Sequence, residues 1–250
     1  MFQFRNLRDS YIVSVQHILP NDEVVSYSGK IDVEAKRIEK EVYRFTLLRR
    51  SDVLVDESPP EYGSDIMMKE IGDSLYPLRF IVSNTGNISD LINFEEIRVR
   101  WTEKREELLR KYHTFEFEQY LKASIQNMAT KQRFMEILQR DVFIQFYFFS
   151  LEKGAAELHL CHFPKNGYKT SYFAVPNQKT DKDHYLLHPV FLKENILKTD
   201  GKLLYKKTKE GDVVNMKLKV NMLMEDQTYY RRNISICKDE NTERLVNLWF

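Results

Sequence analysis

Between Gly86 and Gly154 the chain contains neither glycine nor proline. These two residues are the strongest helix breakers, so a long segment without them permits continuous helical structure. We therefore expect the helices to lie in this central segment. Most of the eight glycines, Gly29 and Gly201 among them, are expected at or near turns.

The spacing of the glycines also excludes the common nucleotide sites. No two glycines are closer than nine positions, so neither G-x-G-x-x-G nor G-x-x-x-x-G-K occurs in the chain. These motifs place backbone N–H groups around phosphates. Dinucleotide-binding, P-loop and kinase-type phosphate sites are therefore excluded.

The charge balance argues against nucleic-acid binding. The chain has 38 Lys and Arg against 37 Asp and Glu, a formal net charge of +1, and its basic pairs are scattered. Nucleic-acid affinity depends on clustered positive charge, so we expect none. A chain of 250 residues with 42% hydrophobic residues can bury a large core, as one domain or two smaller lobes.

The sequence predicts a cytoplasmic protein, unless a presequence was removed. Met1–Tyr11 carries charged residues and lacks the apolar core of a secretory signal. The most apolar stretch, Val142–Phe149, is too short to cross a bilayer. Two cysteines, Cys161 and Cys237, are too few for a disulfide framework, so we expect reduced thiols.

Residues 1–92 have the pattern of antiparallel strands joined by turns. Apolar residues alternate with polar ones, and Asn84 to Asn87 has the composition of a hairpin turn. Val55–Leu75 has the weakest pattern and is predicted to be a long irregular excursion. The expected strands are Tyr11–Leu19, Val24–Val33, Glu41–Leu48, Arg79–Ser83 and Ile88–Ile92.

Residues 93–150 are predicted to be helical. Asn93 and Glu96 resemble a capping box, and the helical period that follows runs to about Tyr112 and continues to Met128. Thr130 is the expected N-cap of the next helix. Val142–Phe149 closes this part, and periodicity alone leaves open whether it is helix or strand. Burial in the core is favoured over contact with a membrane surface, because the segment lacks a basic polar face.

Residues 151–250 return to strand patterns. The expected strands are Glu157–Phe163, Tyr168–Val175, Val214–Met224, Thr228–Lys238 and Glu243–Phe250. The predicted fold is therefore of the α+β class. One or more antiparallel, hairpin-rich sheets from the N- and C-terminal thirds pack on a central block of about three helices.

One cluster of potential metal ligands lies in the C-terminal part, formed by His159, Cys161, His162, His184 and His188. On a strand His159 and Cys161 share a face while His162 points away. We expect His184 and His188 to face together only on a helix, which Pro189 disfavours. Zinc sites usually show tighter motifs such as paired C-x-x-C. Ordinary strand and loop histidines explain the cluster better, and no cofactor is expected.

No catalytic residues can be assigned. No serine lies in G-x-S-x-G, and Cys161 beside His162 is a sequence neighbour pair, whereas thiol proteases bring distant residues together. The acidic pairs Glu95–Glu96 and Glu106–Glu107 lie on a helix face rich in Arg and Lys. A solvated, ion-paired helix surface accounts for them.

Two apolar features are candidate binding elements. Met216, Met222 and Met224 share one face of an expected strand, where thioethers either fill the core or line an adaptable pocket. Trp249 and Phe250 end the chain and belong either to a last strand anchored in the sheet or to a tail that a partner protein captures.

The leading hypothesis is a non-enzymatic adaptor, chaperone or assembly accessory protein that binds another protein. One alternative is a carrier that encloses an apolar small molecule between sheet and helices, and another is an enzyme with a dispersed active site. An apolar cavity would favour the carrier. A filled core with an exposed aromatic patch would favour the adaptor. Convergent histidines and carboxylates would favour the enzyme.

Overall fold

A computed structural model describes residues 7–112, 114–149, 156–164, 168–177, 183–190, 195–208 and 213–239. The strand expected over Glu243–Phe250, with Trp249 and Phe250, lies outside the described residues. The same holds for the turn glycines Gly154, Gly167 and Gly211.

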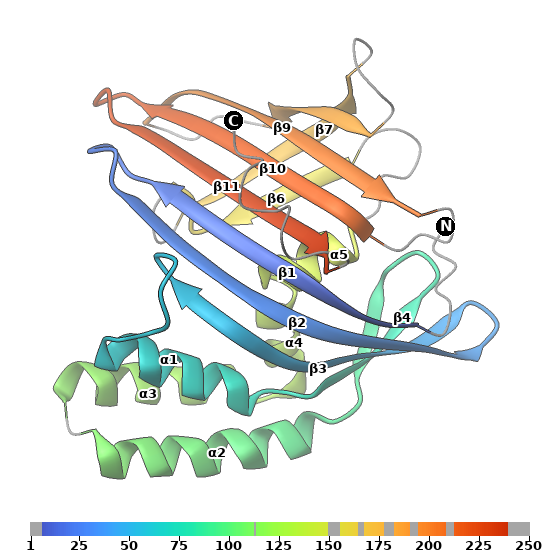
Figure 1. The fold of residues 1–250 in the computed structure, drawn as a ribbon, viewed down its shortest axis with the longest axis vertical. Coiled ribbons are helices and arrows are strands. Elements are labelled where there is room, and N and C mark those ends of the chain that lie inside the picture. The colour runs from blue at the N-terminus through green and yellow to red at the C-terminus, as the bar shows by residue number, and fades with distance from the viewer. Residues whose placement is uncertain are drawn as a thin grey trace.

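Eleven antiparallel strands form one sheet in the order β5-β4-β3-β2-β1-β11-β10-β9-β8-β7-β6. Strand β1 pairs with β11, which joins the N-terminal strands to the C-terminal ones at the middle of the sheet. Figure 1 shows that the sheet curls, so that β6 and β7 lie behind β9, β10 and β11. The strands are β1 Leu7–Ile18, β2 Val24–Glu39, β3 Val42–Val55, β4 Leu78–Ser83, β5 Ile88–Leu91, β6 Ala156–Cys161, β7 Lys169–Pro176, β8 His184–Pro189, β9 Ile196–Lys207, β10 Val213–Met224 and β11 Tyr229–Lys238.

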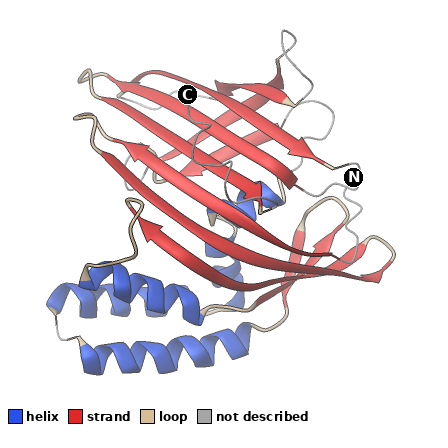
Figure 2. Cartoon of the chain, in the orientation of Figure 1, coloured by secondary structure: helices blue, strands red, loops and turns tan. Residues whose placement is uncertain are grey.

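The described residues also form five helices, most of which gather at one end of the sheet (Figure 2). They are α1 Gly63–Ser74, α2 Phe94–Lys111, α3 Phe115–Asn127, α4 Lys131–Leu138 and α5 Val142–Tyr147. The mixed α+β class with an antiparallel sheet is confirmed. The sheet is larger than predicted, because β2 and β3 are longer and β8 and β9 were not predicted.

The helices differ from the prediction in two places. The segment Val55–Leu75, predicted to be irregular, contains α1, whose pattern is weak because only Met67 and Ile71 are buried. The centre holds four helices where about three were predicted. The break between α2 and α3 comes without glycine or proline, at Thr114, whose hydroxyl accepts a hydrogen bond from the Phe117 N–H. The N-cap prediction for Thr130 is confirmed, because its hydroxyl accepts from the Arg133 N–H.

Helix α5 resolves the ambiguity over Val142–Phe149 in favour of a helix. Four of its six residues are buried, and Val142 and Gln145 are half-buried, which is why its sequence lacks a charged face. The Tyr147 ring lies against Tyr11 of β1 and Phe45 of β3, with ring centroids 5.2 and 5.1 Å apart. On the other side, the Tyr205 hydroxyl of β9 lies 2.7 Å from the Phe149 carbonyl oxygen. Helix α5 is therefore the interior support about which the sheet curls.

Gly29 and Gly201 were expected near turns, but both lie within strands. Gly201 is in the middle of β9, opposite Val220 of β10. A Cβ atom at this position would lie 2.9 Å from the Lys219 carbonyl oxygen, too close for any side chain. Glycine is therefore required where the two strands approach closely.

The side chain of Asn93 does not form the predicted capping box. Asn93 occupies the N-cap position of α2, but its side chain makes no capping hydrogen bond. Its Oδ1 accepts from the Arg79 N–H at 3.0 Å, and its Nδ2 donates to the Pro77 carbonyl at 2.8 Å. The Glu96 carboxylate pairs with the Arg79 guanidinium instead. Asn93 therefore fastens the start of α2 to the start of β4.

We predict that Asn93→Asp lowers the free energy of unfolding by about 1 to 3 kcal/mol, measured by urea denaturation. The side chain keeps its shape but loses the donor to the Pro77 carbonyl, and Asn93 is only 3% exposed. Asn21→Asp in the exposed turn after β1 is the matched control. Equal losses in both variants would contradict the structural role assigned to Asn93.

Candidate functional site

The inner face of the curled sheet changes from buried to exposed along a single cross-strand row. Directly paired residues on neighbouring strands lie on the same face. This row runs through Leu203, Leu218, Ile234, Val15, Tyr27 and Val55, from β9 to β3. Ile234 is fully buried, Val15 and Val55 are half-buried, and Tyr27 is 43% exposed. The apolar inner face thus continues beyond the part that the core covers.

We call the half-buried and exposed part of this face the valine patch. It comprises Val13, Val15, Val25, Val53 and Val55 together with Tyr27. Val53 belongs to it because its side chain lies over Gly29, where an added Cβ would be 3.7 Å away. Helix α5 covers the other end of β1 and β3, where Tyr11 and Phe45 are fully buried. The patch therefore lies outside the contacts of α5, and Arg50 of β3 borders it, because the Arg50 Nε would lie 3.4 Å from a Cβ atom on Gly29.

Next to the patch, an arginine lies on the apolar inner face. Arg232 of β11 is 7% exposed and pairs with His17 of β1, which in turn pairs with Val25 of the patch. Its Nη1 and Nη2 donate to the carbonyls of Cys161 and His162, at 2.9 and 2.6 Å. These carbonyls belong to the end of β6, so Arg232 connects the centre of the sheet to its far edge across the interior.

The positive charge of Arg232 has no acidic partner among the described residues. Besides the two carbonyls, its guanidinium contacts the His17 Nδ1 at 3.4 Å and the face of the Phe163 ring. Burial lowers the pKa of Arg232 to about 10, so the group stays charged at neutral pH. Burial, and then the charge of Arg232, lowers the pKa of His17 from 6.5 to about 4. His17 is therefore neutral and able to accept the Nε–H of Arg232.

Three hydroxyl groups extend this polar region. Tyr172 lies close enough to Arg232 for each to influence the other's pKa, and burial raises the pKa of Tyr172. Its hydroxyl lies 2.8 Å from the Thr199 hydroxyl, which donates to the Asn221 carbonyl. The Thr170 hydroxyl is buried and lies beside the Tyr172 hydroxyl, with which it interacts. We refer to Arg232, His17, Tyr172, Thr199 and Thr170 as the polar cluster.

The sequence contained a signal for Arg232 that composition alone did not reveal. In β11, Tyr230, Ile234 and Ile236 follow the apolar alternation, and Arg232 takes one of the apolar positions. A charged residue at one of the alternate strand positions that face the core requires a hydrogen-bonding or charged partner, or a function that accounts for its burial. Tyr27 gave no such signal, because an apolar residue at an apolar position of a strand is not unusual. Its exposure depends on how far α5 extends over the sheet.

The predicted metal cluster does not form a site within the described residues, which hold no group of three or more His, Cys, Asp or Glu positioned for a metal ion. His159 and Cys161 share the outer face of β6, and the His162 carbonyl points to Arg232. The expectation that His184 and His188 face together only on a helix is wrong. Both lie on strand β8, where positions four apart also share a face.

One histidine of that cluster contacts a serine. His159 Nδ1 lies 2.8 Å from the Ser171 hydroxyl and 3.7 Å from a Glu157 carboxylate oxygen. In a serine triad the acid and the serine contact opposite ring nitrogens, whereas here both groups face Nδ1. This arrangement does not provide the base of a triad.

The three methionines proposed for binding lie inside the structure. Met216 and Met222 are fully buried, and Met224 is 4% exposed. They belong to the same apolar core as Ile234 and Leu218. The free cysteines Cys161 and Cys237 are half-buried and buried, and burial raises the pKa of Cys237.

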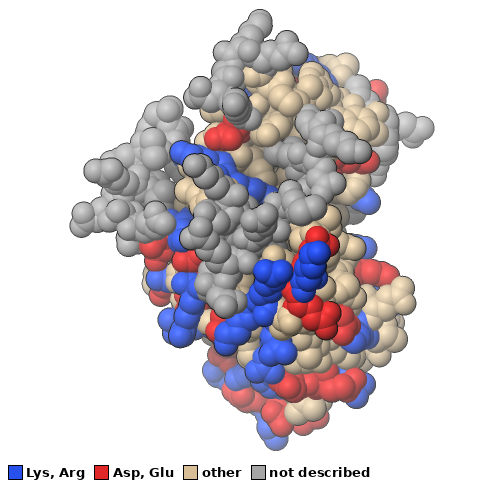
Figure 3. Space-filling model, turned by 90° about the vertical axis from the view of Figure 1, so that its right-hand side faces the viewer, with Lys and Arg blue, Asp and Glu red and all other residues tan. Residues whose placement is uncertain are grey.

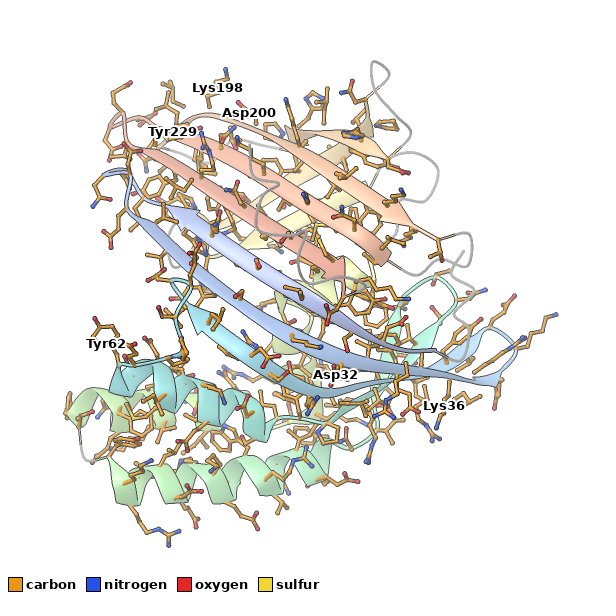
Figure 4. All side chains as sticks on the ribbon, in the orientation of Figure 1. Asp32, Lys36, Tyr62, Lys198, Asp200 and Tyr229 are labelled. Atoms are coloured by element: carbon orange, nitrogen blue, oxygen red, sulfur yellow. The ribbon has the colours of Figure 1, made fainter. Side chains whose placement is uncertain are left out.

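The outer surface carries interleaved charges. Figure 3 shows Lys and Arg side by side with Asp and Glu on one side of the molecule. On the outer face of β2, which carries Asp32 (Figure 4), a hollow is lined by ion pairs between Arg49 and Asp32 and between Lys30 and Asp239. The charges in this hollow are therefore largely paired within the protein.

Comparisons with known proteins identify no family. No family model matches the chain, and no curated protein matches it. Among solved structures, lipovitellin is similar with a TM-score of 0.47 and 11% identity over 95% of this chain. The chain spans 25% of the lipovitellin chain. Rv2717c from M. tuberculosis is similar with a TM-score of 0.28 and 8% identity over 93% of this chain and 92% of that one. At TM-scores below 0.5, neither structure supports an argument about this chain.

The helices give no indication of a membrane span. In the described part of the chain, no helix has both the length and the apolar character needed to cross a bilayer.

We predict that the burial of His17 makes the protein less stable as the pH falls from about 6.5 toward 4. In that range the unfolded chain binds a proton that the folded state resists, so lowering the pH favours unfolding. The measurement is thermal unfolding at neutral pH and near pH 5. In His17→Gln, which keeps an acceptor for Arg232, the difference between the two conditions should shrink.

His188→Gln on the outer face of β8 is the matched control for this experiment. It should keep the wild-type loss of stability on acidification. If His17→Gln keeps the full loss as well, the burial of His17 is not its cause.

Proposed function

We propose that the protein binds an apolar small molecule on the valine patch of the inner face. The observation that carries this proposal is the row from Ile234 to Tyr27. Along it, the apolar face continues out of the core into solvent without changing to polar residues. On a half-exposed strand of purely structural function, the solvent-facing positions are usually polar.

The hydrophobic effect provides the driving force. Each apolar side chain covered by a ligand contributes about 25 cal/mol per Å² of surface removed from water. The patch spans β1, β2 and β3 on the inner side of a curled sheet, so one ligand can contact side chains from three strands at once. The binding energy of such a ligand is the sum of many small contacts.

The residue types in the patch suit a preformed site. Valine is branched at Cβ and has few rotamers, so little side-chain entropy is lost when a ligand orders the surface. Tyr27 adds a large ring with a polar hydroxyl at the more exposed side. A rigid apolar surface of this kind binds by shape and area and needs few hydrogen bonds.

The protein-binding role predicted from the sequence stays a prediction. Tyr62 and Phe115 are 75% and 72% exposed and lie at the starts of α1 and α3. Figure 4 shows Tyr62 pointing away from the sheet. Single exposed aromatic residues are common on soluble proteins, so they support a function less strongly than the continuous row on the inner face.

We predict that the protein binds Nile red, a neutral apolar dye, with saturable fluorescence. The double variant Tyr27→Ser/Val55→Thr should weaken this binding about tenfold, because the two changes remove about 1.4 kcal/mol of apolar contact. Threonine keeps the β-branched shape of valine, which preserves the strand. Fluorescence titration gives the dissociation constants, and thermal unfolding shows whether the variant is folded.

Tyr229→Ser is the control. Tyr229 is 38% exposed, close to the 43% of Tyr27, but lies on the outer face of β11. It should bind the dye as the wild type does. The proposal fails if the wild type shows no saturable binding, or if the folded double variant binds as tightly as the wild type.

A further inference from the structure

The guanidinium group of Arg232 has N–H groups that donate no hydrogen bond to the described residues. It carries five N–H groups, and Nε, Nη1 and Nη2 donate one hydrogen bond each, to His17 and to the Cys161 and His162 carbonyls. Two N–H groups, one on each terminal nitrogen, thus have no acceptor among the described residues.

The charge of Arg232 is unbalanced as well. Its contacts are two carbonyls, a neutral imidazole and an aromatic ring, and no described carboxylate forms an ion pair with it. A buried charge is costly unless an opposite charge accompanies it. The hydrogen bonds to the end of β6 explain why the Arg232 side chain is held in place. They do not explain its charge, because a neutral donor can also form hydrogen bonds to carbonyl oxygens.

Arg232 lies close to the valine patch on the same face of the sheet. Arg232 lies on the strand next to β1, which carries Val13 and Val15 of the patch. It pairs with His17, and His17 pairs with Val25, which lies one strand farther away. Strands in a sheet lie about 4.8 Å apart, which places Val55 of β3 roughly 14 Å from β11. A molecule with a charged group at Arg232 and an extended apolar chain across β1, β2 and β3 fits this arrangement.

We propose that the ligand is an amphiphile whose carboxylate head binds Arg232 and whose apolar chain lies on the valine patch. This inference rests on the proposed function and adds the chemical class of the ligand. A guanidinium binds a carboxylate through two parallel N–H···O bonds, and two N–H groups are available. The Thr170 hydroxyl is a further donor in the polar cluster, and the carboxylate supplies the negative charge that Arg232 lacks.

The first test compares two ligands of equal chain length on the wild-type protein. Lauric acid carries a carboxylate, and lauryl alcohol carries a neutral hydroxyl. Both should displace Nile red at neutral pH, and the acid should bind about tenfold to a hundredfold more tightly, as expected for charge-assisted hydrogen bonds in a buried site. This comparison requires no variant and does not depend on how well a variant folds.

The second test removes the charge. Arg232→Gln keeps donors for the carbonyls at the end of β6 and should bind the acid and the alcohol with equal affinity. Arg49→Gln, on the outer face beside Asp32, removes the same charge elsewhere and should keep the preference for the acid. Competition titrations on both variants, with thermal unfolding to confirm folding, give the result.

The outcomes separate the two proposals. If the wild type binds acid and alcohol with equal affinity, the carboxylate assignment is overturned and the apolar site stands. If folded Arg232→Gln keeps the preference for the acid, Arg232 is not the head-group residue. If neither ligand displaces Nile red and the dye itself does not bind, the proposed function fails.

Discussion

The packing of helix α5 against the inner face of the sheet is the interaction on which the remaining structure depends. Its aromatic residues contact β1 and β3 on one side, and the Tyr205 hydroxyl of β9 meets its last carbonyls on the other. An open antiparallel sheet of this size has one large apolar face that must be covered. Because α5 has only six residues, it covers only part of that face, and the half-buried valine patch lies outside its contacts.

Local patterns predicted most of the elements but not how they are assembled. The strict alternation over Val214–Met224 predicted β10 correctly, and Thr130 marked the start of α4. Helix α1 was missed because a short helix with two buried side chains leaves a weak period. Asn93 was placed correctly at a helix start, yet its hydrogen bonds go to β4, since a tertiary contact satisfies both of its polar atoms.

The candidate site was beyond the reach of sequence patterns for a related reason. The residues noticed in the sequence were histidines, a cysteine, methionines and the aromatic residues Trp249 and Phe250, which stand out by type. Arg232 and Tyr27 are significant only because of their place in the sheet, one inside the core region and one outside it. That distinction depends on cross-strand pairing between β1 and β11, whose residues are more than two hundred positions apart along the chain.

The same pairing determines when the protein can complete its fold during synthesis. Strand β1 leaves the ribosome more than two hundred residues before its neighbour β11. Until then one long edge of the N-terminal strands lacks its partner, and exposed strand edges promote association with other chains. Folding of this sheet is accordingly governed by a late, long-range closure, which favours slow folding and gives molecular chaperones an interval in which to act.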